Sequence, residues 1–195
     1  MEFAQLRTVD LYERMRPYAD QVLQGLWPGC WVERLKGVVN GQPHVLDREF
    51  GIDALVHLRS GQWISMQEKY REYRCLVDPG LQIRPPEPDF TQEYMNAVGT
   101  DRESPGEWFH LAAQVYFFGW ANEDETAFAK WVLLNVPRYK LIVESAGGIE
   151  RFGKLRHNKK HGKASFYCFP ISKVKSAWIA MHWGICVEPS DPLRL

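Results

Sequence analysis

Hydrophobic residues near the beginning of the chain recur at helical spacing. Five of them follow one another at intervals of three or four residues: Leu11, Met15, Tyr18, Val22 and Leu26. This is the period of one face of an α-helix, and the Pro28-Gly29 pair that follows cannot continue a helix. The pattern predicts a helix over residues 8–26.

A β-type pattern begins after this helix. Residues 30–39 favour a strand that ends at the turn signal Asn40-Gly41. Residues 52–58 and 63–70 favour two further strands, and Ser60-Gly61 lies between them as a short turn. We therefore predict a β-hairpin here, and it is the clearest pair of elements in the chain.

The rest of the chain predicts a mixed order of elements. The pattern favours a proline-rich loop at 78–90, a largely buried helix at 107–120, a strand at 128–134, a turn at 135–137, a strand or short helix at 138–144, a strand at 166–171, and at 172–185 an ambiguous segment with a slight preference for helix. Helices and strands in this order predict a mixed α/β sandwich. We expect one domain over residues 1–195, with a core at about 8–145 and a basic C-terminal part at 146–195.

Composition supports this expectation. The chain has 195 residues, of which 45% are hydrophobic, and its 26 aromatic residues exclude a disordered chain. The longest apolar run, at 111–120, is too short to span a membrane, and no signal peptide is visible. Four widely spaced cysteines without a CxxC pair indicate reduced thiols in or near the core. We expect a cytoplasmic protein without a membrane partner.

The net charge of zero hides two segments of opposite charge. Residues 151–175 contain eight Lys and Arg and no acid, whereas residues 87–125 contain nine acids and one Arg. Such segregation creates a local field on a neutral protein. The basic segment also contains Phe152, Phe166 and Tyr167, so it suits contact with a phosphate backbone, although a solvated loop would have the same composition.

The predicted hairpin brings three polar residues together. Side chains on a strand alternate between its faces, so Gln67, Lys69 and Arg71 share one face. A turn at Ser60-Gly61 sets positions near 53 opposite positions near 68. We therefore expect Asp53, Gln67 and Lys69 to converge at one end of the hairpin.

These residues suit a divalent cation and a water nucleophile. Mg²⁺ prefers oxygen ligands and retains several waters. Asp53 offers a carboxylate oxygen, Gln67 an amide oxygen, and Glu68 a main-chain carbonyl. Lys69 can then orient or deprotonate a water for attack on a phosphodiester.

The same residues resemble the PD-(D/E)xK nuclease superfamily. Gly51-Ile52-Asp53 and Gln67-Glu68-Lys69, with 13 residues between Asp53 and Gln67, are similar to the variant of Mrr-type restriction endonucleases, in which Gln replaces the second acid. The resemblance covers about 20 residues. It implies a restriction endonuclease-like fold, which is an α/β fold with a central mixed β-sheet flanked by helices. It also implies that Asp53 and Gln67 bind Mg²⁺ or Mn²⁺ and that Lys69 is the catalytic lysine.

The superfamily often adds an acid from its first helix. Glu13 is our candidate, and Asp10 or Glu33 would serve as well. Asp47 is either a supporting acid or a turn residue, and Arg71 either holds a phosphate or is a solvent-exposed strand residue.

The expected function is that of a metal-dependent DNA endonuclease, a hydrolase whose partner is DNA. The candidates for binding the nucleic-acid backbone are Arg71, Lys154, Arg156, Lys159, Lys160 and Lys163. A homodimer would supply two sites for cutting both strands. The alternative is a catalytically inactive domain of the same fold that binds nucleic acid or another protein. The compressed spacing of His157, Asn158 and His161 does not fit an HNH nuclease.

Overall fold

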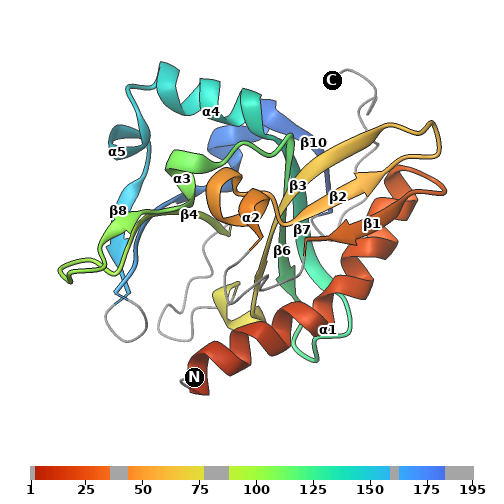
Figure 1. Cartoon of the computed structure of the whole chain (residues 1–195), viewed down its shortest axis with the longest axis horizontal. Helices are drawn as coiled ribbons and strands as arrows, with labels where there is room; N and C mark the ends of the chain where they lie inside the picture. Colours follow the sequence, from red (N-terminus) through yellow and green to blue (C-terminus); the bar gives the residue numbers. More distant parts are fainter. Residues whose placement is uncertain (1–2, 36–43, 77–87, 159–162, 183–195) are drawn as a thin grey trace.

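The computed structural model describes residues 3–35, 44–76, 88–158 and 163–182. Within these ranges the larger sheet has six strands in the order β1-β2-β3-β6-β7-β10 (Figure 1). Their bounds are β1 (Trp31–Arg34), β2 (Ala54–His57), β3 (Trp63–Arg71), β6 (Val115–Ala121), β7 (Phe128–Asn135) and β10 (Trp178–His182). The first three form an antiparallel meander, β6 runs parallel to β3, and β7 and β10 continue antiparallel. The sheet is therefore mixed and is flanked by helices, as the sequence predicts.

Helix α1 (Phe3–Leu26) covers one face of this sheet (Figure 1). Its buried residues Leu11, Met15 and Ala19 recur every four positions and pack with the sheet residues Val56 and Met66. The helix predicted over residues 8–26 is confirmed and begins earlier, at Phe3. Its apolar stripe forms one of two hydrophobic cores in the described part of the chain.

A second sheet packs against the opposite face of the larger one. Its described strands lie in the order β5-β4-β9-β8, with bounds β4 (Asp89–Asn96), β5 (Ser104–Pro105), β8 (Lys154–His157) and β9 (Ser165–Pro170). Helices α4 (Val136–Ser145) and α5 (Ile149–Phe152) and the 3-10 helix η2 (Ile171–Ala177) complete this side. The ring of Phe90 lies 4.7–5.4 Å from the rings of Tyr116, Phe118, Tyr139 and Phe169. Many of the aromatic residues in the sequence therefore build the core between the two sheets.

The predicted hairpin is confirmed. β2 pairs with β3 in antiparallel register, from Ala54 opposite Met66 to His57 opposite Trp63. The turn between them is closed by hydrogen bonds from the N–H of Leu58 to the carbonyl of Gln62 and from the N–H of Gly61 to the carbonyl of Leu58. This register determines which side chains meet at the candidate site.

The helix predicted at residues 107–120 is wrong for most of its length. Only α3 (Glu107–His110) is helical, and Val115–Ala121 forms strand β6 in the centre of the sheet. Every residue of β6 is buried. A strand buried on both faces is apolar throughout and lacks the alternation that distinguishes a strand from a buried helix.

The turn predicted at residues 135–137 is the beginning of helix α4. The Asn135 side chain caps this helix by accepting a hydrogen bond from the N–H of Arg138 at 2.9 Å. Pro137 lies in the first turn, where its missing N–H costs nothing. Of the two predictions for residues 138–144, the helix is correct.

The remaining predictions have mixed outcomes. The strands at 128–134 and 166–171 correspond to β7 and β9. The slight preference for helix at 172–185 is wrong over Trp178–His182, because η2 ends at Ala177 and β10 follows, and residues 183–185 lie outside the described ranges. Strand β1 lies within the predicted 30–39, and β4 and β8 were not predicted as strands. The Asn40-Gly41 turn and most of the 78–90 loop lie outside the described residues.

The described cysteines are free thiols. Cys30 is buried and Cys168 is half-buried, as expected, but Cys75, at the end of the 3-10 helix η1 (Tyr73–Cys75), is exposed, so a near-core position is wrong for it. Cys186 lies outside the described residues. None of the helices in the described ranges is long and apolar enough to cross a membrane.

Candidate active site on the β2–β3 hairpin

Asp53 lies at the end of the hairpin, directly before β2. The register of β2 and β3 ends with Ala54 opposite Met66, so Asp53 and Gln67 are the next residues of the two segments beyond it. The N–H of Asp53 donates to the carbonyl of Met66 at 2.9 Å, and its Oδ2 accepts a hydrogen bond from the N–H of Glu68 at 3.0 Å. The hairpin therefore brings Asp53 and Gln67 together as predicted.

Gln67, Lys69 and Arg71 share the face of β3 that points away from α1, because their neighbours Glu68 and Tyr70 face the helix. The Oε1 atom of Gln67 is buried and has no hydrogen-bond partner among the described residues. Buried polar atoms in folded proteins nearly always have a partner. This amide oxygen therefore has unused hydrogen-bonding capacity among the described residues.

Lys69 is held by an acid that was not among the predicted site residues. Its Nζ donates to Oε2 of Glu107 at 3.1 Å, and the two side chains are 15% and 11% exposed. Glu107 begins α3, in the crossover that leads from β3 to the parallel strand β6. No local sequence pattern relates Glu107 to Lys69, so this ion pair could not be inferred from the sequence.

Asp47 is hydrogen-bonded to Asp53 and lies in the first turn of α2 (Val45–Phe50). Burial raises the pKa of Asp47, against the smaller lowering effect of the hydrogen bond with Asp53. Gly51 ends α2 with φ of 55°, and a Cβ atom there would lie 3.2 Å from the Cα of Leu111. A glycine at this position therefore allows the segment after α3 to approach Asp53.

The surroundings of Asp53 are rich in negative charge. Burial and, after it, the charges of Glu68, Asp47 and Glu107 together raise its pKa to about 8, against the lowering effect of the hydrogen bond from the N–H of Glu68. Asp53 therefore keeps its proton at neutral pH in the isolated chain. A cation bound here would replace that proton and compensate the same charges.

Tyr12 of α1 is a further neighbour that sequence reasoning missed. Burial, and after it the charge of Asp53, raises the pKa of its phenol, which also forms a hydrogen bond with the main chain of Tyr70. The ring of Tyr12 packs against the ring of Tyr70 at 4.7 Å. The first helix thus reaches the end of β3 through a tyrosine.

Glu13, the predicted acid of this helix, is not grouped with Asp53. Successive residues of a helix point about 100° apart, and Glu13 is 51% exposed and ion-pairs with Arg16. The other two candidates also lie at the surface. Asp10 ion-pairs with Arg14, and Glu33 pairs with His57 at 2.9 Å.

Glu68 forms its hydrogen bond with Asp53 through its main chain. Its side chain is 1% exposed and points toward α1, where Oε1 accepts hydrogen bonds from Arg34 at 3.1 Å and Arg16 at 3.3 Å. The hydroxyl of Tyr70 donates to Oε2 at 2.6 Å. On a β-strand the N–H and C=O of one residue point to the same neighbouring strand. Since the N–H of Glu68 reaches Asp53, its carbonyl is directed to the same side.

Positive charge extends from this site toward the second sheet. Arg71 donates a hydrogen bond to the hydroxyl of Thr91 on β4. Burial and, after it, the charge of Asp89 raise the pKa of the Cys168 thiol on β9 to about 11, whereas the charges of Arg156, Arg71 and Lys69 act to lower it. Cations of β3 and of β8 therefore both act on this thiol.

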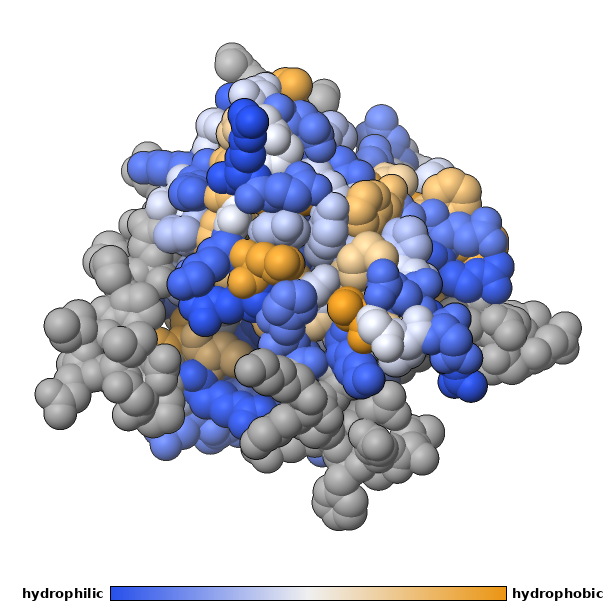
Figure 2. Space-filling model, turned by 90° about the vertical axis from the view of Figure 1, so that its left-hand side faces the viewer, coloured by the Kyte–Doolittle hydropathy of each residue, from blue (hydrophilic) through white to orange (hydrophobic). Residues whose placement is uncertain are grey.

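Lys154 and Arg156 are exposed on β8, opposite Cys168 and Phe166 of β9. Lys163 is exposed in the turn that precedes β9, whereas Lys159 and Lys160 lie outside the described residues. Figure 2 views the molecule from the side on which β8 lies, and this side is mainly hydrophilic. The surface is not purely basic, because Glu93 of β4 is also opposite Phe166.

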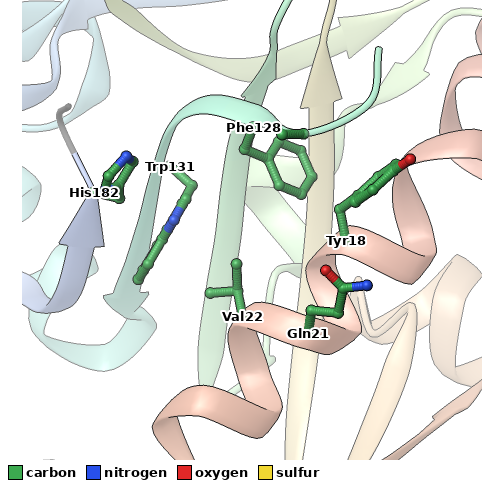
Figure 3. Close-up of a pocket in the computed structure, with 7 residues that line it drawn as sticks. Tyr18, Gln21, Val22, Phe128, Trp131 and His182 are labelled. Atoms are coloured by element: carbon green, nitrogen blue, oxygen red, sulfur yellow. The ribbon is translucent and has the colours of Figure 1, made fainter.

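A separate pocket of about 330 Å³ lies between α1, β7 and β10. Figure 3 shows its lining, which consists of Tyr18, Gln21, Val22, Ala127, Phe128, Trp131 and His182. It contains none of the predicted catalytic residues. It lies on the α1 face of the sheet and is therefore distinct from the Asp53 site.

Mg²⁺ fits the residues around Asp53 better than a metal that needs a complete protein cage. No three His, Cys, Asp or Glu side chains in the described ranges are arranged as a metal-binding group. Proteins usually bind Mg²⁺ through one or two carboxylates, together with waters and substrate phosphates. Asp53, supported by Asp47, and the unpartnered oxygen of Gln67 match that smaller requirement.

Comparisons with models of protein families, with curated proteins and with solved structures each find no match. The resemblance to PD-(D/E)xK nucleases, and the fold name that it implies, therefore remain predictions from about 20 residues of sequence.

Proposed function

We propose that this chain hydrolyses phosphodiester bonds of DNA with Mg²⁺ or Mn²⁺ as cofactor, and that its sheets form a restriction endonuclease-like fold. The observation that carries the proposal is the convergence of Asp53, Gln67 and Lys69 on one face of the hairpin, where Gln67 Oε1 is buried without a described partner. The antiparallel meander followed by a parallel strand supports the fold.

Each residue has a distinct role in this proposal. Asp53, Gln67 and the main-chain carbonyl of Glu68 would hold the ion. When bound, it would supply positive charge that stabilises the charge developing on the phosphate. Lys69 would orient the attacking water or, after passing its own proton to Glu107, accept the proton of that water. Glu107 would hold the Lys69 side chain through the 3.1 Å contact.

The cationic residues beyond the site would bind the DNA backbone. Arg71 adjoins Lys69 on β3, and the exposed Lys154, Arg156 and Lys163 lie on or beside β8. Contacts of this kind give affinity that depends steeply on salt and carries little sequence information. Cleavage of both strands would need two sites, which a homodimer would supply.

The experiment is incubation of the full chain with supercoiled plasmid, linear duplex and branched DNA in Mg²⁺, Mn²⁺ or EDTA. We expect cleavage that EDTA, Asp53→Asn and Lys69→Met abolish. Asp53→Asn retains an acceptor for the N–H of Glu68, and Lys175→Met, on the exposed surface of η2, is the matched lysine control. DNA affinity should be nearly unchanged in Lys69→Met, because most of the cations lie elsewhere. Cleavage that persists in both site variants would refute the assignment.

One contact favours a second candidate, a domain of the same fold that binds nucleic acid or another protein without catalysis. Lys69 is already paired with Glu107, and the neutral Gln67 contributes less to cation binding than an acid would. Such a protein would bind DNA, with steep salt dependence, or another protein. It would be indifferent to Mg²⁺ and to Lys69→Met. DNA binding without cleavage of any substrate would support this candidate.

A further inference from the structure

Three aromatic side chains form a row across the larger sheet, next to the turn between β2 and β3 and therefore at the other end of the hairpin from Asp53. Trp31 of β1 is opposite His57 of β2, and His57 is opposite Trp63 of β3. Residues directly opposite each other carry their side chains on the same face. Trp31 and Trp63 are each 56% exposed. We call Trp31, His57 and Trp63 the aromatic row.

Neighbouring contacts fix the orientation of the row. The rings of Trp31 and His57 are stacked, with centroids 3.9 Å apart and planes 2° from parallel. The Nε2 atom of His57 lies 2.9 Å from Oε2 of Glu33, which is two residues from Trp31 on the same face of β1. The stack is therefore in place before any ligand binds, which reduces the entropy lost on binding.

The row lies on the same face of the sheet as the candidate active site. His57 follows Asp53 by four residues, and Trp63 precedes Gln67 by four residues. Because side chains alternate along a strand, both pairs share a face, and their separation is about 13 Å at the usual rise per residue. A flexible polymer bound at the site would reach the row.

The chemistry of the row favours bases over phosphates as its ligand. Aromatic side chains stack on the flat faces of bases, whichever base is present. Glu33 adds negative charge beside the row, so the row does not attract a phosphate backbone by its charge. In a duplex the base faces are covered by neighbouring base pairs. The occupant that fits is therefore a strand with unpaired bases.

We propose that Trp31 and Trp63 stack on unpaired bases and lead a single-stranded segment of nucleic acid toward Asp53 and Lys69. This inference rests on the proposed function, because it names the substrate class of the same site. A substrate with a single-stranded end, flap or gap would then be bound more tightly than a continuous duplex.

The test is the anisotropy of a short fluorescein-labelled oligo(dT) strand titrated with the full chain in EDTA. Trp31→Ala and Trp63→Ala should each weaken binding about fivefold or more, since stacking on one aromatic side chain contributes at least that much. Trp31→Phe retains a ring and should bind almost as the unchanged protein does. Leu141→Ala removes a hydrophobic residue of α4 that is 64% exposed and should have no effect.

Four results would overturn the proposal. The first is that both alanine variants, with unchanged circular dichroism spectra, bind oligo(dT) as tightly as Leu141→Ala does. The second is that a blunt duplex of equal length binds as tightly as oligo(dT) and loses as much affinity in the variants. The third is that the row binds a soluble oligosaccharide instead of oligo(dT). The fourth is that sedimentation shows a dimer that only the Trp variants dissociate, without any change in oligo(dT) affinity.

The use of EDTA separates this inference from the proposed function, because binding is measured without cleavage. If the protein never cleaves DNA but the Trp variants lose oligo(dT) affinity, base stacking on the aromatic row is supported and the nuclease activity is refuted. If the protein cleaves DNA with a metal ion but the Trp variants keep normal oligo(dT) affinity, the nuclease activity is supported and base stacking on the aromatic row is refuted.

Discussion

The Nζ atom of Lys69 donates a hydrogen bond to Oε2 of Glu107, although 37 residues separate them in the sequence. The lysine comes from the hairpin, and the acid comes from the crossover that brings β6 alongside β3. The contact therefore links the two parts of the chain that build the candidate site.

The first prediction concerns this pair. Lys69→Met and Glu107→Gln should each lower the free energy of unfolding by about 1–3 kcal/mol, because each change leaves a poorly solvated charge unpaired. The double variant should lose less than the sum of the two, by about 1 kcal/mol or more. Urea unfolding of the four proteins measures this coupling, and additive effects would show that the pair contributes nothing.

A second prediction uses the titration of Asp53. Its pKa is about 8 in the folded chain and has the ordinary value of 3.8 in the unfolded chain. Between these values the folded state binds more protons, so the contribution of Asp53 to stability falls as the pH rises. Asp53→Asn removes this loss and should raise the free energy of unfolding by about 1–3 kcal/mol near pH 8, with a smaller gain at lower pH.

Urea unfolding in EDTA at several pH values tests this effect. Asp10→Asn is the control, since Asp10 is 64% exposed and ion-paired to Arg14 at the surface. If Asp53→Asn has the same pH dependence of stability as the unchanged protein, Asp53 does not titrate as described.

The third prediction concerns the basic residues of β8. Changing Lys154 and Arg156 together to Ala should weaken DNA binding and make the slope of log affinity against log salt shallower by about 2. Both side chains are exposed, so the fold should be unaffected. A salt titration measures the slope, and Lys175→Ala is the control. An unchanged slope would move the DNA surface away from β8.

The fourth prediction concerns the ion-pair network beneath the hairpin. Arg34 bonds both oxygens of Asp20 and donates to the buried Glu68. Arg34→Met should lower the free energy of unfolding by about 2–4 kcal/mol, because it removes one of the two cations that compensate Glu68. Arg59→Met, in the exposed turn, is the control in urea unfolding. A loss as small as that of the control would show that Arg16 alone compensates Glu68.

The hairpin was predictable because its information is local. The Ser60-Gly61 turn determines the register, and the alternation of faces determines which side chains converge. The contacts of Asp53 with the main chain of Met66 and Glu68, on either side of Gln67, therefore follow from residues 52–70 alone. The same reasoning explains why α1 was correctly predicted from the spacing of its buried residues.

The rest of the site depends on contacts between distant parts of the chain. Glu107 was predicted to lie in a long buried helix, because the apolar strand β6 after it lacks alternation. Tyr12 and Glu13 are neighbours in the sequence, and only the packing of α1 on the sheet determines that the tyrosine faces β3. The sequence alone therefore does not show which side chain of the first helix faces the site.

The parallel pairing of β3 with β6 also has a consequence for the order of folding. The β1–β2–β3 meander forms from sequence neighbours, whereas β6 joins β3 only after residues 72–114 have closed a long loop. Loop closure of this kind is slow compared with hairpin formation. During synthesis, the first 71 residues would leave the ribosome with one edge of β3 unpaired and open to other strands. Slow synthesis of residues 72–121 is therefore expected to promote aggregation of this protein.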